Sequence, residues 1–114
     1  MEVCRRMDRV PWVPHPTAEG VRIKPIITRK DDGLDVTCIL VAIPAGKEVG
    51  EHVHKDQYDI LYPLAGKAVM WVDGVGEFEL APGVAVRVPN GTKHKIFEVG
   101  EDLLIYDVFC PAPA

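Results

Sequence analysis

The sequence predicts an all-β, single-domain protein, and three observations support this fold class. From Val21 onward, short β-branched runs alternate with Gly, Pro or Asp turns, which gives about nine candidate strands spaced about 8 to 12 residues apart. No stretch of ten or more residues repeats its apolar positions with the period of a helix. A length of 114 residues favours one domain, with a core that needs no disulfide.

Turn chemistry separates the candidate strands. The pair Asp73-Gly74 predicts a tight β-hairpin. Gly66 is expected to serve another turn, and Pro63 indicates an edge position or a bulge, because proline donates no hydrogen bond to a sheet. The candidate strands cover residues 21–29, 36–43, 48–54, 58–64, 67–72, 75–80, 84–88, 93–99 and 103–109.

The first part of the chain is expected to be irregular. Pro11, Pro14 and Pro16 prevent regular helix or central strand. The apolar residues between them are more numerous than in a disordered tail. We therefore expect residues 1–20 to pack on the barrel or on a second subunit, with the β domain spanning residues 21–114.

Charge and cysteine content narrow the class of protein. With 13 basic and 17 acidic residues, the net charge of −4 gives no reason to expect nucleic acid or an anionic membrane as a partner. The three cysteines are an odd number without a CxxC pair, so we expect a reducing compartment. No signal peptide or membrane-spanning run is evident, and a cytoplasmic location is predicted.

Three of the four histidines form a candidate metal site. His52 and His54 stand two residues apart on a candidate strand, so their side chains share a face. His94 follows a Pro-Asn-Gly turn, and Asp59 can supply a carboxylate. Histidines with a carboxylate suit Mn, Fe, Ni, Cu or Zn. By spacing alone, ordinary surface histidines explain the pattern about as well, and His15 is expected to be a solvated loop residue.

The same stretch resembles the first motif of the cupins, which are small β-barrel proteins. In this motif a glycine precedes HxH by five residues, and an acidic residue and a second glycine follow. Gly46, His52, His54, Asp59 and Gly66 occupy these positions, with aspartate in place of the usual glutamate.

A second motif strengthens the resemblance. Gly83 is followed after five residues by Pro89-Asn90-Gly91, then by His94 and finally by Glu98, where the family has asparagine. Two motifs in order imply a single-domain cupin-type β-barrel, which is a double-stranded β-helix or jelly roll. Small cupins of this layout commonly form homodimers, and the apolar chain ends are the expected interface.

The resemblance also implies a ligand set. It predicts that His52, His54 and His94 bind one divalent transition metal ion (Mn, Fe, Ni, Cu or Zn), with Asp59 as the fourth ligand. Two alternatives stay open at this point. The fourth ligand is Tyr58 in the variant motif that places it one residue earlier, or it is water.

The implied function is a metal-dependent enzyme that acts on a small organic molecule, with a dioxygenase as the first expectation. The alternatives are a non-catalytic cupin that binds or senses a small molecule, an isomerase or epimerase, and a metal-holding structural protein. Tyr58 and Glu98 are the candidate catalytic residues, since Glu98 is expected to share the strand face of His94. The expected pocket wall comprises Tyr62, Trp71, Phe78, Ile96, Tyr106 and Phe109.

Overall fold

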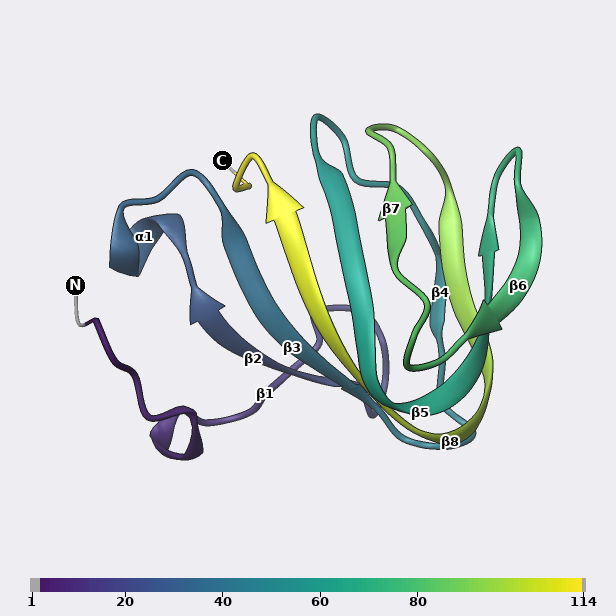
Figure 1. The fold of residues 1–114 in the computed structure, drawn as a ribbon, viewed down its shortest axis with the longest axis horizontal. Helices are drawn as coiled ribbons and strands as arrows, with labels where there is room; N and C mark the ends of the chain where they lie inside the picture. Colours follow the sequence, from purple (N-terminus) through teal and green to yellow (C-terminus); the bar gives the residue numbers. More distant parts are fainter. Residues whose placement is uncertain (1–2, 114) are drawn as a thin grey trace.

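The computed structural model describes residues 3–113, so the outermost ends of the expected segments 1–20 and 21–114 lie outside the described residues. Within it, eight strands form one antiparallel sheet that curls over on itself (Figure 1). The elements are η1 (Met7–Arg9), β1 (Val13–Pro14), β2 (Arg22–Ile27), α1 (Arg29–Asp32), β3 (Thr37–Ile43), β4 (Val49–His52), β5 (Tyr58–Val72), β6 (Gly76–Leu80), β7 (Val86–Val88) and β8 (His94–Cys110).

The strand order creates a cupin-type β-barrel. The main path runs β1-β2-β3-β8-β5-β6, while β4 pairs with β8 and β7 pairs with β5. The two long strands, β5 and β8, bend at the bottom of Figure 1 and continue into both walls of the barrel. The predicted all-β class is confirmed.

The expected breaks within β5 and β8 are wrong. Four of the nine candidate strands merge into these two, because the chain bulges at the expected turns instead of reversing. Gly66 lies inside β5 with a φ of 92°, and a Cβ atom there would lie 2.2 Å from the carbonyl oxygen of Asp102 in β8. Glycine is therefore required by the close approach of the two strands.

Two other turn and bulge predictions are confirmed. Asp73 and Gly74 connect β5 to β6 as a hairpin, in which the backbone N–H of Val75 donates to the carbonyl of Val72 at 3.0 Å. The register between β5 and β8 shifts next to Pro63, so proline does occupy a bulge.

The N-terminal segment lies against the barrel. Val13 in β1 pairs with Ile23 in β2, which adds a short strand to the sheet edge. The ammonium group of Lys24 donates to the carbonyl of Met7 at 2.8 Å and lies 4.9 Å from the ring centroid of Trp12. These contacts direct the following residues toward one end of the barrel.

The barrel encloses an apolar core with a few buried polar side chains. Of these, Asp59, His94 and Asp107 point inward near one end. None of the helices in the described part of the chain has the length and apolar character needed to cross a membrane. The core consists of Val21, Val41, Ile43, Val49, Leu61, Ala68, Met70, Val72, Leu80, Val86, Val88, Ile96, Val99, Leu103 and Ile105.

Candidate metal centre

The two predicted motifs meet at one end of the barrel. His52 ends β4 and is the register partner of His94, the first residue of β8. The loops beside them are joined by two hydrogen bonds. The backbone N–H of Asp56 donates to Oδ1 of Asn90 at 2.7 Å, and that of Gly91 donates to the carbonyl of His54 at 3.1 Å. The Pro-Asn-Gly turn thus holds both histidine segments in place.

The three imidazole rings form one cluster with a carboxylate. The ring centroids of His52 and His94 lie 4.2 Å apart, and those of His52 and His54 lie 4.8 Å apart. Each ring and Asp59 offer one ligand atom, and these four atoms all lie within 4.8 Å of one another. The four residues could therefore hold a metal ion.

Backbone carbonyls fix the orientation of two rings. Nδ1 of His52 lies 2.8 Å from the carbonyl oxygen of Gly50, and Nδ1 of His94 lies 2.8 Å from that of Thr92. A carbonyl only accepts, so each Nδ1 carries the hydrogen and donates. In the neutral rings Nε2 is left with a free lone pair, as a metal ligand requires.

Burial favours the neutral form of two of the rings. Partial burial lowers the pKa of His52, and it also lowers the pKa of His54 against the opposing effect of the Asp59 charge. A neutral imidazole binds a metal without first losing a proton.

Asp59, and not Tyr58, is brought to the histidines. Asp59 is 3% exposed and points into the barrel, whereas Tyr58 is 42% exposed on the outer face of β5. Oδ2 of Asp59 lies 3.2 Å from Nε2 of His94 and 3.5 Å from Nε2 of His54. The shorter side chain of aspartate therefore reaches the cluster.

A second buried carboxyl supports Asp59. Burial, together with the hydrogen bond and the charge of Asp59, raises the pKa of Asp107 well above 3.8, which favours the protonated form of Asp107. Burial works against ionisation of Asp59 as well, but the neighbouring side chains of Asp107 and His94 outweigh it and lower the pKa of Asp59. If Asp107 had no proton, Oδ1 of Asp59 and Oδ1 of Asp107 would both be buried without a hydrogen-bond partner.

The donor set fits a divalent transition ion. When Nδ1 of His94 donates to Thr92, its Nε2 and the facing Oδ2 of Asp59 are both acceptors at 3.2 Å. Two facing lone pairs require a positive charge between them, either a proton or a metal ion. Three imidazoles and one carboxylate match the ligands preferred by Mn, Fe, Ni, Cu and Zn.

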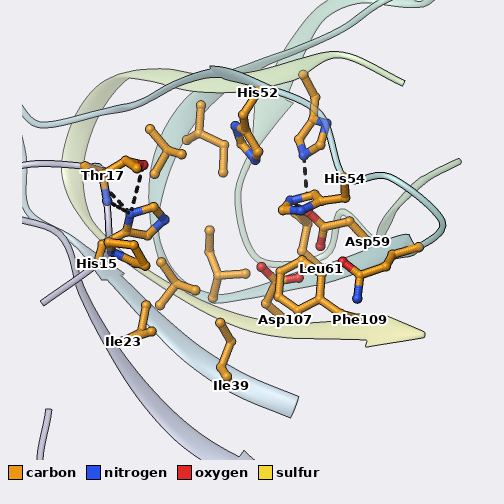
Figure 2. Close-up of a pocket in the computed structure, with 18 of the residues that line it drawn as sticks. His15, Thr17, Ile23, Ile39, His52, His54, Asp59, Leu61, Asp107 and Phe109 are labelled. Atoms are coloured by element: carbon orange, nitrogen blue, oxygen red, sulfur yellow. Dashed lines mark hydrogen bonds and ion pairs between the residues drawn. The ribbon is translucent and has the colours of Figure 1, made fainter. Parts of the chain in front are cut away.

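The cluster lies on the wall of a pocket of about 730 Å³. Figure 2 shows His52, His54 and Asp59 on one side of the pocket, with Ile23 and Ile39 away from them toward the other side. The lining is mainly apolar, and it also includes Val41, Val49, Leu61, Ile96, Ile105 and Phe109.

The predicted pocket wall is correct at two of six positions. Ile96 and Phe109 line the pocket, and the rings of Phe109 and His54 lie 4.8 Å apart. The other four expected residues do not line it. Tyr62 and Tyr106 are register partners, and Tyr62 is 43% exposed. The remaining two are Trp71 and Phe78.

The candidate catalytic residues lie away from the pocket lining. Tyr58 is on the outer face, where the guanidinium carbon of Arg87 lies 5.9 Å from its ring centroid. The expectation that Glu98 shares the face of His94 is wrong. Glu98 has a positive φ of 48°, so the strand bulges there and turns Val99 inward in its place.

His15 and Asp107 are among the pocket residues that were not expected from the sequence. His15 lines the pocket, although a solvated loop position was predicted for it, and no local pattern signals this placement. Asp107 also lines it, and here a signal existed. It is a single charged residue inside an apolar strand run, with Ile105 and Phe109 two residues away on either side.

Fold and site together define a β-barrel protein with a potential metal centre at a small-molecule pocket. Residues 39–109 match the family model described as the cupin domain, which is more than half of the chain. The chain therefore belongs to the cupin family. A Streptomyces coelicolor protein, itself named as uncharacterized, is 33% identical over 72 residues, which are 63% of this chain and 67% of that one.

Solved structures share the fold at low sequence identity. A predicted oxalate decarboxylase from Thermotoga maritima has a TM-score of 0.79 and 18% identity, covering 95% of this chain and 97% of its own. KdgF from a Halomonas species has a TM-score of 0.78 and 24% identity, with 93% and 92% covered. The polyketide cyclase RemF from Streptomyces resistomycificus has a TM-score of 0.81 and 19% identity, with 100% and 83% covered. These likenesses concern the fold alone.

Proposed function

We propose that this cupin is a metal-dependent enzyme that acts on a small, largely apolar organic molecule, and that a dioxygenase reaction is the first to test. One observation carries the proposal. His52, His54, Asp59 and His94 place four ligand atoms within 4.8 Å of one another on the wall of a pocket of about 730 Å³.

The pocket has the properties of a substrate site. Its volume lies within the range of about 300 to 1,000 Å³ that is typical of small-molecule sites. Its wall is mainly apolar, with polar groups gathered at the histidine cluster. A metal-holding structural protein would not need such a pocket beside its ion.

The chain's own residues would perform two tasks. His52, His54, His94 and Asp59 would hold the ion, which when bound supplies a Lewis acid or an oxygen-activating centre. The apolar wall, with Ile39 and Phe109 among its residues, would bind the carbon skeleton and exclude water. A bound ion held by these four residues would still be open to a small molecule from the pocket side.

The range of similar structures supports an enzyme without fixing the reaction. Their names include a decarboxylase and a cyclase, so isomerisation or cyclisation without oxygen is the second class to test. A sensor would bind the same kind of molecule without turnover. The experiment below would then show retained metal but no O2 uptake.

The test is reconstitution with single metals. Protein freed of metal is loaded separately with Fe²⁺, Mn²⁺, Ni²⁺, Cu²⁺ and Zn²⁺, and O2 uptake is measured with catechols, β-diketones and flavonols. The expected result is uptake with Fe²⁺, Mn²⁺, Ni²⁺ or Cu²⁺ but not with Zn²⁺, and its loss in His94→Ala. Failure to retain any of the five metals would contradict the proposal.

A homodimer and a cytoplasmic location stay predictions. The homodimer is supported by an outward row on β5, where Tyr58, Ile60, Tyr62 and Leu64 are 42%, 41%, 43% and 50% exposed. Apolar rows of this kind are typical of protein interfaces. Met7 and Trp12 of the N-terminal segment contact Lys24 of their own barrel, and a place for this segment at the interface stays a prediction.

A further inference from the structure

His15 stands apart from the metal centre on the wall of the same pocket. Figure 2 shows its ring on the side opposite His54 and Asp59, with Ile23 and Ile39 near it. The residue comes from the loop after β1. Its backbone N–H donates to the carbonyl of Val21 at 2.8 Å, which ties this loop to the start of β2.

Loop hydrogen bonds determine which ring nitrogen of His15 carries the hydrogen. Nδ1 accepts from the backbone N–H groups of Thr17 at 3.1 Å and Ala18 at 2.9 Å, and the hydroxyl of Thr17 lies 3.5 Å away. A nitrogen that accepts from backbone donors carries no hydrogen itself. The hydrogen of the neutral ring is therefore on Nε2.

This Nε2–H group is a donor without a partner in the described residues 3–113. In Figure 2 the Nδ1 side of the ring faces the loop of Thr17, and the opposite nitrogen faces the pocket. Partial burial lowers the pKa of His15, which favours the neutral ring and hence a single donor. Nε2 is not among the buried polar atoms that lack a partner, so it is accessible on the pocket wall and can donate to an acceptor on a bound molecule.

We infer that His15 positions the substrate by donating a hydrogen bond from Nε2 to an oxygen at the end of the molecule remote from the metal centre. This rests on the proposed function, since it assumes that the substrate binds beside His52, His54, Asp59 and His94. It adds the substrate class. The molecule has an oxygen ligand for the ion at one end, an apolar middle and a hydrogen-bond acceptor at the other end.

Two substitutions separate this role from a structural one. In His15→Asn the shorter side chain offers an oxygen that can accept from the N–H groups two and three residues later, as in an Asx turn, but it presents no ring donor to the pocket. His15→Phe keeps a ring and removes both nitrogens. A residue that only holds the loop would tolerate asparagine and not phenylalanine.

The probes are matched pairs of catechols. One member carries a ketone that is attached directly to the ring, as in 3,4-dihydroxyacetophenone, or is separated from the ring by one or two methylene groups. The other carries a branched alkyl group of the same shape, as in 4-isopropylcatechol. Binding to the Zn²⁺-loaded protein without O2 is measured by calorimetry. The preference for the ketone is measured in the wild-type protein and in His15→Phe. Because the two catechols differ in acidity to the same extent in both experiments, this comparison removes the effect of acidity.

For each matched pair, the preference is the Kd of the alkyl catechol divided by the Kd of the ketone. For at least one spacing of the ketone from the ring, this ratio should be about five- to tenfold larger in the wild-type protein than in His15→Phe, as one hydrogen bond predicts. His15→Asn is expected to behave like His15→Phe. Retention of the preference in His15→Asn, or its absence in the wild-type protein, would overturn the inference.

Two further results distinguish the possible failures. If the wild-type protein retains Zn²⁺ but binds none of the catechols, this inference is overturned, whereas failure to retain Zn²⁺ or any other metal contradicts the proposed function itself. Independently of any ligand, the imidazole ¹H–¹⁵N spectrum should show the hydrogen of His15 on Nε2. A hydrogen on Nδ1 would overturn the inference while leaving the metal centre untouched.

Discussion

Nε2 of His94 lies 3.2 Å from Oδ2 of Asp59, and the backbone holds the His94 ring so that its neutral form presents a lone pair to this carboxylate. The two acceptors are unfavourable neighbours until a positive charge lies between them. A cation between these two groups would offset the cost of burying a carboxylate beside three imidazoles, and the four residues could hold one.

Removal of the negative charge of Asp59 should weaken metal binding. Asp59→Asn keeps the shape of the side chain but offers only a neutral oxygen, so we expect the affinity for Zn²⁺ or Mn²⁺ to fall about 100-fold. The metal should also stabilise the wild-type fold by about 2.7 kcal/mol at 100 times its Kd. Calorimetric titration and thermal unfolding measure both effects. The control is Asp73→Asn in the β5–β6 turn, which should bind like the wild-type protein.

The protonated carboxyl of Asp107 should make stability depend on pH. Folding raises its pKa above 3.8, so the folded protein keeps a proton that the unfolded chain has lost. The resulting stabilisation is complete below about pH 4 and is lost as the pH rises through the folded-state value, by about 1.4 kcal/mol for each unit of the raised pKa. In metal-free Asp107→Asn this loss is absent, since the amide donates to Asp59 at any pH.

Urea unfolding between pH 4 and pH 7 measures this difference. The free energy of unfolding of the wild-type protein, relative to that of Asp107→Asn, should fall across the interval. The exposed Asp73→Asn substitution again serves as the control for loss of one charge. Parallel curves for the wild-type protein and Asp107→Asn would show that Asp107 is ionised in the folded protein.

Replacement of Gly66 by alanine should destabilise the protein more than replacement of Gly74. Alanine at this position places Cβ 2.2 Å from the Asp102 carbonyl oxygen at a φ of 92°, so β5 and β8 must move apart. We expect a loss of about 3 kcal/mol or more. Gly74→Ala is the matched control, with a φ of 82° and no atom within 4 Å, and it should lose about 1 kcal/mol. Equal losses would refute the close-approach explanation.

The outward row on β5 should mediate the homodimer. Ile60→Lys places a charge within it and is expected to yield a monomer in sedimentation velocity experiments, with the fold retained. Val75→Lys is the control, because Val75 is 73% exposed at the tip of the β5–β6 hairpin, away from this row. A wild-type protein that sediments as a monomer would contradict the predicted dimer.

The sequence was a good guide wherever local chemistry decides the structure. The Asp73-Gly74 turn and the bulge at Pro63 follow from backbone preferences of single residues. The histidine cluster follows from two short motifs whose spacing is matched by strand geometry. The turn, the bulge and each motif taken singly depend only on residues close together in the chain.

The failures arose where distant segments decide the outcome. Gly66 and Glu98 occupy bulges that exist only because β5 and β8 bend together, and each bulge reverses which residues face inward. The expectation that Glu98 shares the strand face of His94 therefore failed. His15 reaches the pocket because β1 pairs with the edge of β2, which no pattern near His15 announces.

The metal centre is tested most directly by anomalous diffraction. Crystals of the protein soaked with Zn²⁺ and measured at the zinc edge should show one strong peak about 2.0 to 2.2 Å from Nε2 of His52, His54 and His94 and from a carboxylate oxygen of Asp59. The same peak should vanish in crystals of His94→Ala. A peak elsewhere, or none between these four residues, would contradict the account.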